Sequence, residues 1–459
     1  MSYHFPPSGA VGALRWEKMA PFARDHGWAL DVITAHPDVL AKLDSTRLRT
    51  LPSETRVFAV NPMSHWVQRL ERWRAWRASL LPAESRADKS GRQPAGDDDQ
   101  ALLPIEELRW RLNWTALRRA YGAWRYYVGE RCWSEPAERL AVMLGSSQKY
   151  EAILSSGPPH LAHVAAARAG HRLGVPVVLD FRDPWSLMPS APEHVASPLW
   201  RSLGARYEQE AVSRATLVVT NTALARSAME RRYPQLTGHV ITVMNGVDAE
   251  ALPEAPTRNR FVIAYAGNIY IDRNPRILFR ALNRLVRERN LDPTQIGAEF
   301  MGNADHLEGR TVAEIAAEEG IEPFVKMLPP GPHAAALQFL AAATVLVSLP
   351  QRTPLSIPSK VFEYLRFDAW PLIIAGPETA TGRLLEGTSV PVFDPDDVDG
   401  MHRFLTNRWD RFARGERPTP LPERTELTRE AQARILFDRL RAEIGSPRLP
   451  LTGAVQVAR

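Results

Sequence analysis

The chain has almost no cysteine: Cys132 is the only one among 459 residues. One thiol cannot close an internal disulfide, so the sequence favours a reducing, cytosolic compartment over secretion. No run of about 18 uncharged apolar residues is present, as a membrane-spanning helix would need. The opening MSYHFPPSGA also lacks the basic start and apolar stretch of a signal peptide. These absences exclude a disulfide-framed secreted domain and predict a protein without spanning helices.

Several common functional motifs are also missing. The sequence contains no phosphate loop, no G-x-G-x-x-G, no G-x-S-x-G and no C-x-x-C pair, which argues against common NTPases, dehydrogenases, hydrolases and zinc domains. The net charge of +5 is small for this length, and no aromatic-basic RNA motif appears, so we expect no nucleic-acid partner. We expect no cofactor and no metal.

Short β-branched runs alternate with helical stretches along the chain, a pattern typical of parallel sheets with crossover helices. Expected strands fall in two sets, separated by the turn-rich segment 245–260: 28–35, 55–61, 150–156, 175–181, 215–221 and 239–244, then 261–267, 296–302, 325–328, 344–349, 371–375 and 390–394. The length also favours more than one domain. We therefore expect an α/β protein with two facing Rossmann-like domains.

The expected domains have the following bounds. The first covers 1–246 and contains a Trp- and Arg-rich helical insertion at 64–133, within which the polar segment 83–107 is expected to be a mobile loop. The second covers 247–427, a C-terminal helix covers 428–445, and the tail 446–459 is expected to be disordered.

The first strand is unusually short. The turn Pro6–Gly12 arrives almost at once and leaves at most Ser2–Phe5 for a strand that is normally buried in such a domain. Either the coding start lies further upstream or the central strand is clipped, and we expect the former.

Two segments are candidates for binding phosphate. Gly9 and Gly12 lie just before a helix, where backbone amides can approach an anion, although glycines in such a turn are often only structural. In SIPSKVFEYL, Ser359 and Lys360 would occupy the first helical turn and suit a diphosphate, and Glu363 one turn later suits ribose hydroxyls. An ordinary amphipathic helix explains the second pattern equally well.

Three further segments follow expected strands. AGNIYIDRNP carries Arg273 and Arg276, which would neutralise a pyrophosphate or simply lie exposed. His160 and His163 share a helix face, but no third or fourth ligand stands at a recognisable spacing, so zinc is not expected; they would orient a sugar hydroxyl or be structural. In DFRDPW, residues 180–185, Asp180, Arg182 and Asp183 would form an ion-pair network or face a ligand.

In order and type these segments resemble the family 4 glycosyltransferases, retaining enzymes of the two-Rossmann (GT-B) type. The resemblance rests on YHFPPSGAVGALRW, ILSSGPPH, LDFRDPW, VMNGVD, AGNIYIDRNP and IPSKVFEYL. It implies a retaining transfer of a sugar from a nucleotide-sugar donor to a lipid-linked or polysaccharide acceptor. By the same resemblance Gly9 and Gly12 face the donor phosphates, Ser359, Lys360 and Arg273 meet the diphosphate, and Glu363 meets the ribose.

The chain departs from that family at three positions. Leu355 stands where many members carry the first of two glutamates, the second of which matches Glu363. Ser156 stands where many carry a histidine before the prolines, and Asn268 where an arginine is common. The resemblance therefore places Ser156, His160, His163 and Asn268 among the site residues and leaves the contacts to the transferred sugar open. A non-catalytic homologue that binds or scaffolds is the alternative.

The insertion carries most of the positive charge. The segment 108–133 has a net charge of +5 and 64–82 one of +3, together more than the whole chain. Within 108–133 apolar side chains recur at helical spacing and form what we call the aromatic stripe: Trp110, Trp114, Leu117, Tyr121, Trp124 and Val128. The pattern predicts peripheral binding to an anionic membrane surface, or packing of the stripe on the first domain.

Overall fold

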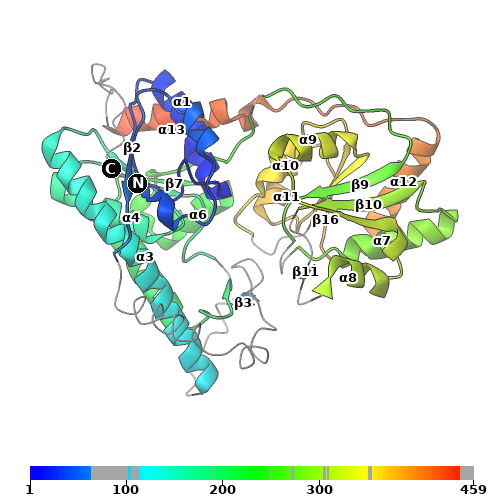
Figure 1. Cartoon of the computed structure of the whole chain (residues 1–459), viewed down its shortest axis with the longest axis horizontal. Coiled ribbons are helices and arrows are strands. Elements are labelled where there is room, and N and C mark those ends of the chain that lie inside the picture. Colours follow the sequence, from blue (N-terminus) through cyan, green and yellow to red (C-terminus); the bar gives the residue numbers. More distant parts are fainter. Residues whose placement is uncertain are drawn as a thin grey trace, which may run out of the picture. The chain divides into compact units, whose positions relative to one another are not determined.

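The computed structural model describes residues 1–63, 102–104, 113–188, 190–248, 250–269, 273–302, 306–307, 310–349 and 354–444. They divide into two compact units (Figure 1). Unit 1 takes its described residues from 1–245 and 429–444, and unit 2 takes its own from 246–428. Unit 1 is therefore built from both ends of the described chain.

The central sheet of unit 1 is parallel. Its four main strands follow the order β4 (Ile153–Gly157), β5 (Val177–Phe181), β7 (Leu217–Thr220) and β8 (Val240–Thr242). A second parallel pair joins β1 (Asp31–Ala35) to β2 (Arg56–Val60). The start of the chain lies between β1 and β4, where Ser2 bridges Ser156 and its amide donates to the carbonyl of Ile33.

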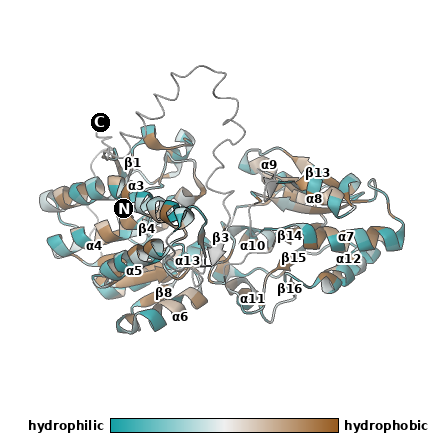
Figure 2. Cartoon of the chain, turned by 90° about the horizontal axis from the view of Figure 1, so that it is seen from below, coloured by the Kyte–Doolittle hydropathy of each residue, from teal (hydrophilic) through white to brown (hydrophobic). Residues whose placement is uncertain are grey.

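Helices cover this sheet with their apolar sides. One core cluster packs α1 (Leu14–Asp25) and α13 (Arg429–Ile444) on the sheet through Met19, Leu436 and Phe437. Another packs α3 (Trp114–Ser147) and α4 (Leu161–Leu173) through Trp133 and Ala162. The remaining helices of unit 1 are α5 (Pro198–Val212) and α6 (Ala223–Arg232). In Figure 2 the helices are banded teal and brown, as expected of elements with one buried side.

Unit 2 has one parallel sheet of six strands. Their order is β13 (Val325–Leu328), β10 (Ile296–Met301), β9 (Phe261–Ala266), β14 (Val345–Ser348), β15 (Trp370–Ile374) and β16 (Val392–Phe393). Because β9 lies at the centre, its carboxyl end is flanked by strands on both sides. The helices are α7 (Arg276–Arg289), α8 (Val312–Glu318), α9 (His333–Ala342), α10 (Ser359–Tyr364), α11 (Ala380–Leu385) and α12 (Val398–Ala413).

Two elements differ from the sequence-based expectation. Residues 102–104 lie in the segment 83–107 expected to be a loop, but they form β3 (Leu102–Pro104), which pairs antiparallel with β6 (Ser190–Pro192). The helix expected to end with the insertion at 133 continues as α3 to Ser147, through Pro136. The rest of 64–112 and the tail 446–459 lie outside the described residues, as does Trp110.

The aromatic stripe is divided along α3. Trp114, Leu117 and Tyr121 are exposed, with 87% of Trp114 accessible, whereas Val128 is buried. The stripe therefore packs on unit 1 only at its later end. Among the described residues, no helix is both long and apolar enough to cross a bilayer.

Candidate functional site

In unit 2, Lys360 lies at the carboxyl end of β9. Its ammonium donates to the carbonyl of Ala266 at 2.9 Å and sits 3.7 Å from the centre of the Tyr265 ring. The lysine reaches this position because Pro358 ends an extended segment and α10 begins at Ser359. The side chain thus runs back across the central strand instead of into solvent.

A second cation lies beside Lys360. Nη1 of Arg273 donates to the Tyr265 hydroxyl at 3.2 Å and to the carbonyl of Asn268 at 3.3 Å. Burial and the nearby Arg273 charge hold the pKa of Lys360 well below its usual value, against the opposing effect of Glu363. Two positive groups gathered at a strand end repel each other, and an anion bound between them would relieve that repulsion.

Gly267 is the residue that lets the Lys360 ammonium approach the backbone. Its φ is +128°, a conformation that favours glycine, and a Cβ there would lie 2.8 Å from the Lys360 ammonium nitrogen. The turn after β9 therefore leaves room for the Lys360 ammonium to lie close to the main chain.

The other residues expected in this unit are arranged around Lys360. Ser359 is exposed at the first turn of α10, and Glu363 is partly buried on the same short helix. Asn268 presents its carbonyl to both Tyr265 and Arg273, with the Tyr265 hydroxyl at 2.7 Å. Arg276, the other cation of this segment, lies 3.4 Å from the carboxylate of Glu318 in an ion pair.

In unit 1, Gly12 and Arg182 define the turn before α1. Arg182 Nη1 donates to the Gly12 carbonyl at 2.6 Å, and a Cβ on Gly12 would meet the same guanidinium. The Gly9 amide donates a hydrogen bond to the backbone carbonyl of Lys42. The 3₁₀ turn Val11–Ala13 that opens the helix has no side-chain cap, and the amino end of a helix favours an anion.

The histidines of unit 1 are held in an aromatic pocket. His160 stacks on Trp185 with ring centres 5.0 Å apart, and the fully buried His163 pairs its Nδ1 with the Ser155 hydroxyl at 2.8 Å. Burial, with smaller effects from the N-terminal amino group and Arg182, lowers the pKa of His163 to about 3. Ser156 is buried in β4, where its amide donates to the Met1 carbonyl. The two imidazoles are therefore neutral at physiological pH.

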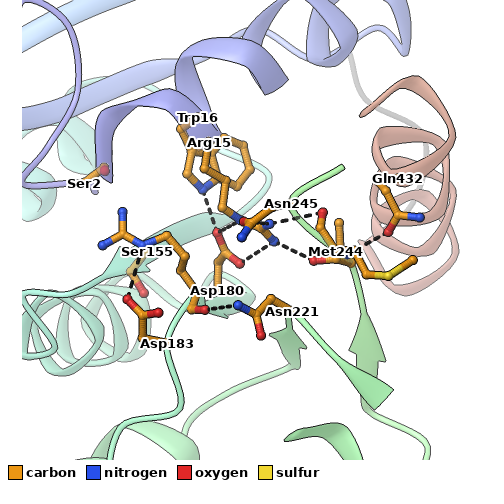
Figure 3. A network of polar contacts seen from close by, with 12 residues as sticks. Ser2, Arg15, Trp16, Ser155, Asp180, Asp183, Asn221, Met244, Asn245 and Gln432 are labelled. Carbon is orange, nitrogen blue, oxygen red and sulfur yellow. Dashed lines mark hydrogen bonds and ion pairs between the residues drawn. The ribbon is translucent and has the colours of Figure 1, made fainter. Parts of the chain in front are cut away.

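Figure 3 shows a buried polar network, of which the sequence pattern indicates only a part. The sequence indicates Asp180 as a polar residue at a strand end. It does not indicate Arg15, which donates two hydrogen bonds of 2.9 Å to the Asp180 carboxylate. An arginine within an amphipathic helix gives no signal of burial in the sequence. Asp183, which the sequence also places in a possible ion-pair network, lies 3.5 Å from Arg182 and is half exposed.

Comparison with known proteins gives a consistent picture of the fold. No protein-family model matches the chain, and no curated protein matches it. HepE from Anabaena, solved in complex with UDP and glucose, is similar at a TM-score of 0.53 and 15% identity, over 95% of this chain and 94% of HepE. A glycosyltransferase from Rickettsia africae ESF-5 is similar at 0.51 and 10% identity, over 98% and 93% of the two chains.

At these identities the likeness shows the fold. The expectation of an α/β protein of the two-domain GT-B type is confirmed, since both units carry parallel sheets and the similarity spans nearly the whole of each chain.

Proposed function

We infer that this protein is a retaining glycosyltransferase that binds a nucleotide-sugar donor in unit 2. The observation that carries the inference is the pair of cations, Arg273 and Lys360, gathered at the end of β9 next to Gly267. A diphosphate is the group that such a pair suits best, because it spreads two or more negative charges over several acceptor oxygens. The glycosyltransferases of similar fold, and UDP in HepE, are consistent with this ligand.

The chemistry follows from where charge develops. In the transfer, the bond between the anomeric carbon and the diphosphate oxygen breaks, and its electron pair stays on that oxygen. Arg273 and Lys360 stabilise the growing negative charge, and removal of one such donor costs about 3 kcal/mol in the barrier. The acceptor hydroxyl forms its new bond on the same face of the sugar, and its proton passes to the departing oxygen.

The remaining residues take supporting roles in this proposal. Ser359 contacts the diphosphate and Glu363 the ribose hydroxyls, while Asn268 shapes the turn after β9 through its carbonyl. In unit 1 the turn that contains Gly9 and Gly12 contacts donor phosphate. We expect His160, His163 and Ser156 at the end of β4 to bound the position of the sugar.

The test is donor turnover, with product analysis by mass spectrometry. Wild type should release nucleoside diphosphate from one member of a nucleotide-sugar panel, with UDP-sugars tried first. Glu363→Ala should weaken donor binding about tenfold or more, measured by calorimetry, because it removes a charged hydrogen-bond acceptor. Glu378→Ala, which removes an exposed glutamate of the same unit, is the matched control. Equal affinity of wild type and Glu363→Ala for every donor that binds would refute the assignment.

A non-catalytic, donor-binding homologue is the second candidate. Leu355 favours it, since a leucine cannot accept the hydrogen bond that a carboxylate would take from the sugar. The two candidates separate in one experiment: binding of a nucleotide sugar without release of product, in the presence of lipid-linked and polysaccharide acceptors, would support the binding protein.

The acceptor is proposed to be lipid-linked or a polysaccharide, reached from an anionic membrane surface. The support is the exposed start of α3, where Trp114, Leu117 and Tyr121 lie among the arginines of 108–133. Wild type should sediment with anionic vesicles at low salt and not with neutral ones. Replacing Trp114, Leu117 and Tyr121 together by serine should abolish sedimentation with little loss of thermal stability, because all three side chains are exposed. A triple variant that still sediments would contradict the proposal.

A further inference from the structure

Unit 1 contains an apolar slot beside the first residue. The cavity has a volume of about 160 Å³ and lies between β1 and β4. Its walls are mostly apolar and come from both sides of the sheet: Trp28, Leu30, Ala141, Leu144, Leu440 and Ile444. An engineered apolar cavity of about 150 Å³ is large enough to bind benzene, so this slot has room for side chains.

The slot continues a strand that has already begun. The amide of Ser2 donates to the Ile33 carbonyl at 3.0 Å, and the Ser156 amide donates to the Met1 carbonyl at 3.0 Å. The first residues thus pair in parallel with β1 on one side and β4 on the other, as a central strand does. They join the β1–β2 pair to the four-stranded sheet.

This ladder stops at the N-terminal amino group of Met1. The Met1 ammonium donates to the Leu154 carbonyl at 2.5 Å inside the sheet. Burial lowers the pKa of this ammonium to about 5. A backbone amide in the same place would make the same hydrogen bond without the cost of desolvating a charge.

The alternation of hydrogen bonds shows which backbone groups face the slot. The Arg56 amide donates to the Leu30 carbonyl, so the backbone amide and carbonyl groups of Leu30, and of every second residue after it, point to β2. The backbone groups of Asp31 and Ile33 therefore point to the slot. On the other wall the Ile153 amide donates to the Pro176 carbonyl, so the backbone groups of Ile153 point to β5. The backbone groups of its neighbours Ala152 and Leu154 therefore point to the slot.

We propose that the slot is a binding site for a short apolar strand joined ahead of Met1, which runs parallel between β1 and β4. Counted back from Met1, the first residue of such a segment donates its amide to the Asp31 carbonyl and accepts a hydrogen bond from the Ile33 amide. The second residue before Met1 donates its amide to the Ala152 carbonyl and accepts a hydrogen bond from the Leu154 amide. These four groups continue the ladder in register with Met1 and Ser2.

Side-chain alternation sets the chemistry of the segment. Met1 packs on the cluster that includes Trp133 and Ala141 of α3, so the second residue of the segment faces the same helix, near Leu144. The first residue faces the other side of the sheet, toward Phe437 and Leu440 of α13. Both positions are lined by hydrocarbon, so both favour β-branched apolar residues.

The test uses the full chain extended ahead of Met1 by Lys-Val-Ile-Val, in which Val comes directly before Met1. Filling the slot should raise the melting temperature by about 5 °C or more. It should also slow hydrogen exchange at the Ile33 and Leu154 amides. The matched control carries Pro in place of the last Val; it removes the ammonium equally, but has no N–H for the Asp31 carbonyl.

Stabilisation and slowed exchange with Val, and neither with Pro, support a strand site. Equal effects of Val and Pro would overturn the proposal, because relief of the buried charge alone would then explain the gain. No change with either extension would also overturn it. Slow exchange at both amides in the unextended chain, together with a dimer mass, would show that a second copy fills the slot instead. None of these outcomes depends on glycosyl transfer.

Discussion

Arg15 and Asp180 form a buried two-point ion pair in unit 1, in which Nε lies 2.9 Å from Oδ2 and Nη2 lies 2.9 Å from Oδ1. Trp16 adds a third hydrogen bond to the same carboxylate, and Arg15 also donates to the carbonyl of Val243 and to the side chain of Asn245 (Figure 3). The pair therefore fastens the first helix to the last residues of unit 1 before the chain passes to unit 2.

Breaking this pair should destabilise unit 1 strongly. Asp180→Asn leaves the Arg15 guanidinium buried without a counter-charge, at a cost of about 3 kcal/mol in the free energy of unfolding. Urea unfolding measures the loss. Asp183→Asn, at a half-exposed carboxylate near Arg182, is the control and should cost less than about 1 kcal/mol.

The two members of the pair should also be strongly coupled. In a double-mutant cycle, Arg15→Met combined with Asp180→Leu should lose less stability than the two single changes added together, since neither charge is left alone. Additive losses would show that the two residues act independently.

Donor binding at Lys360 should take up a proton. Its pKa is held low by burial and by Arg273, and a bound diphosphate would favour the charged amine and raise that pKa. The affinity for nucleoside diphosphate should therefore fall as pH rises above the pKa of the free lysine. Calorimetry in buffers of different ionisation enthalpy measures the uptake directly.

Lys360→Met should remove both the uptake and most of the affinity. Lys326→Met, at an exposed lysine on β13 of the same unit, should preserve both. Proton uptake that persists in Lys360→Met would mean that another group titrates on binding.

His163 should make unit 1 less stable in acid. Its pKa of about 3 in the folded protein lies below the ordinary value of 6.5, so the unfolded chain binds the proton more readily. The contribution is fully present above pH 6.5 and is lost as pH falls toward 3, by at most about 1.4 kcal/mol for each pH unit.

The dependence is measured by urea unfolding between pH 7.5 and 4.5. His163→Phe should flatten the slope of the unfolding free energy against pH. Any effect of the substitution that is the same at every pH leaves this slope unchanged. His171→Gln removes an exposed imidazole of the same helix, α4, and should leave the slope as in wild type. An unchanged slope in His163→Phe would show that other groups cause the acid sensitivity.

The sequence predicted the buried parallel strands well. Runs such as 175–181 and 344–349 agree with β5 and β14 to within two residues, because a strand covered on both faces is a continuous apolar run. The position of Lys360 at the first turn of α10 followed from Pro358.

What the sequence did not predict depends on distant contacts. β3 exists only because Leu102–Pro104 finds Ser190–Pro192 far along the chain, and neither segment has the alternation of a strand. The aromatic stripe has one period throughout, yet Trp114 is exposed and Val128 is buried, since periodicity tells which residues share a face and not what covers it. From the sequence alone, Arg15 is expected to lie at the surface, because nothing in the sequence shows that Asp180 lies beside it.

The division of unit 1 between the two ends of the described chain bears on how the protein is made. The described residues of unit 2 all come from one stretch, 246–428, which can collapse on its own as it leaves the ribosome. Unit 1 cannot: the pocket for Leu436 and Phe437 of α13 stays open until residues synthesised after the whole of unit 2 emerge. The nascent first half therefore keeps this apolar surface exposed until α13 is synthesised, and exposed apolar surface favours aggregation during that time.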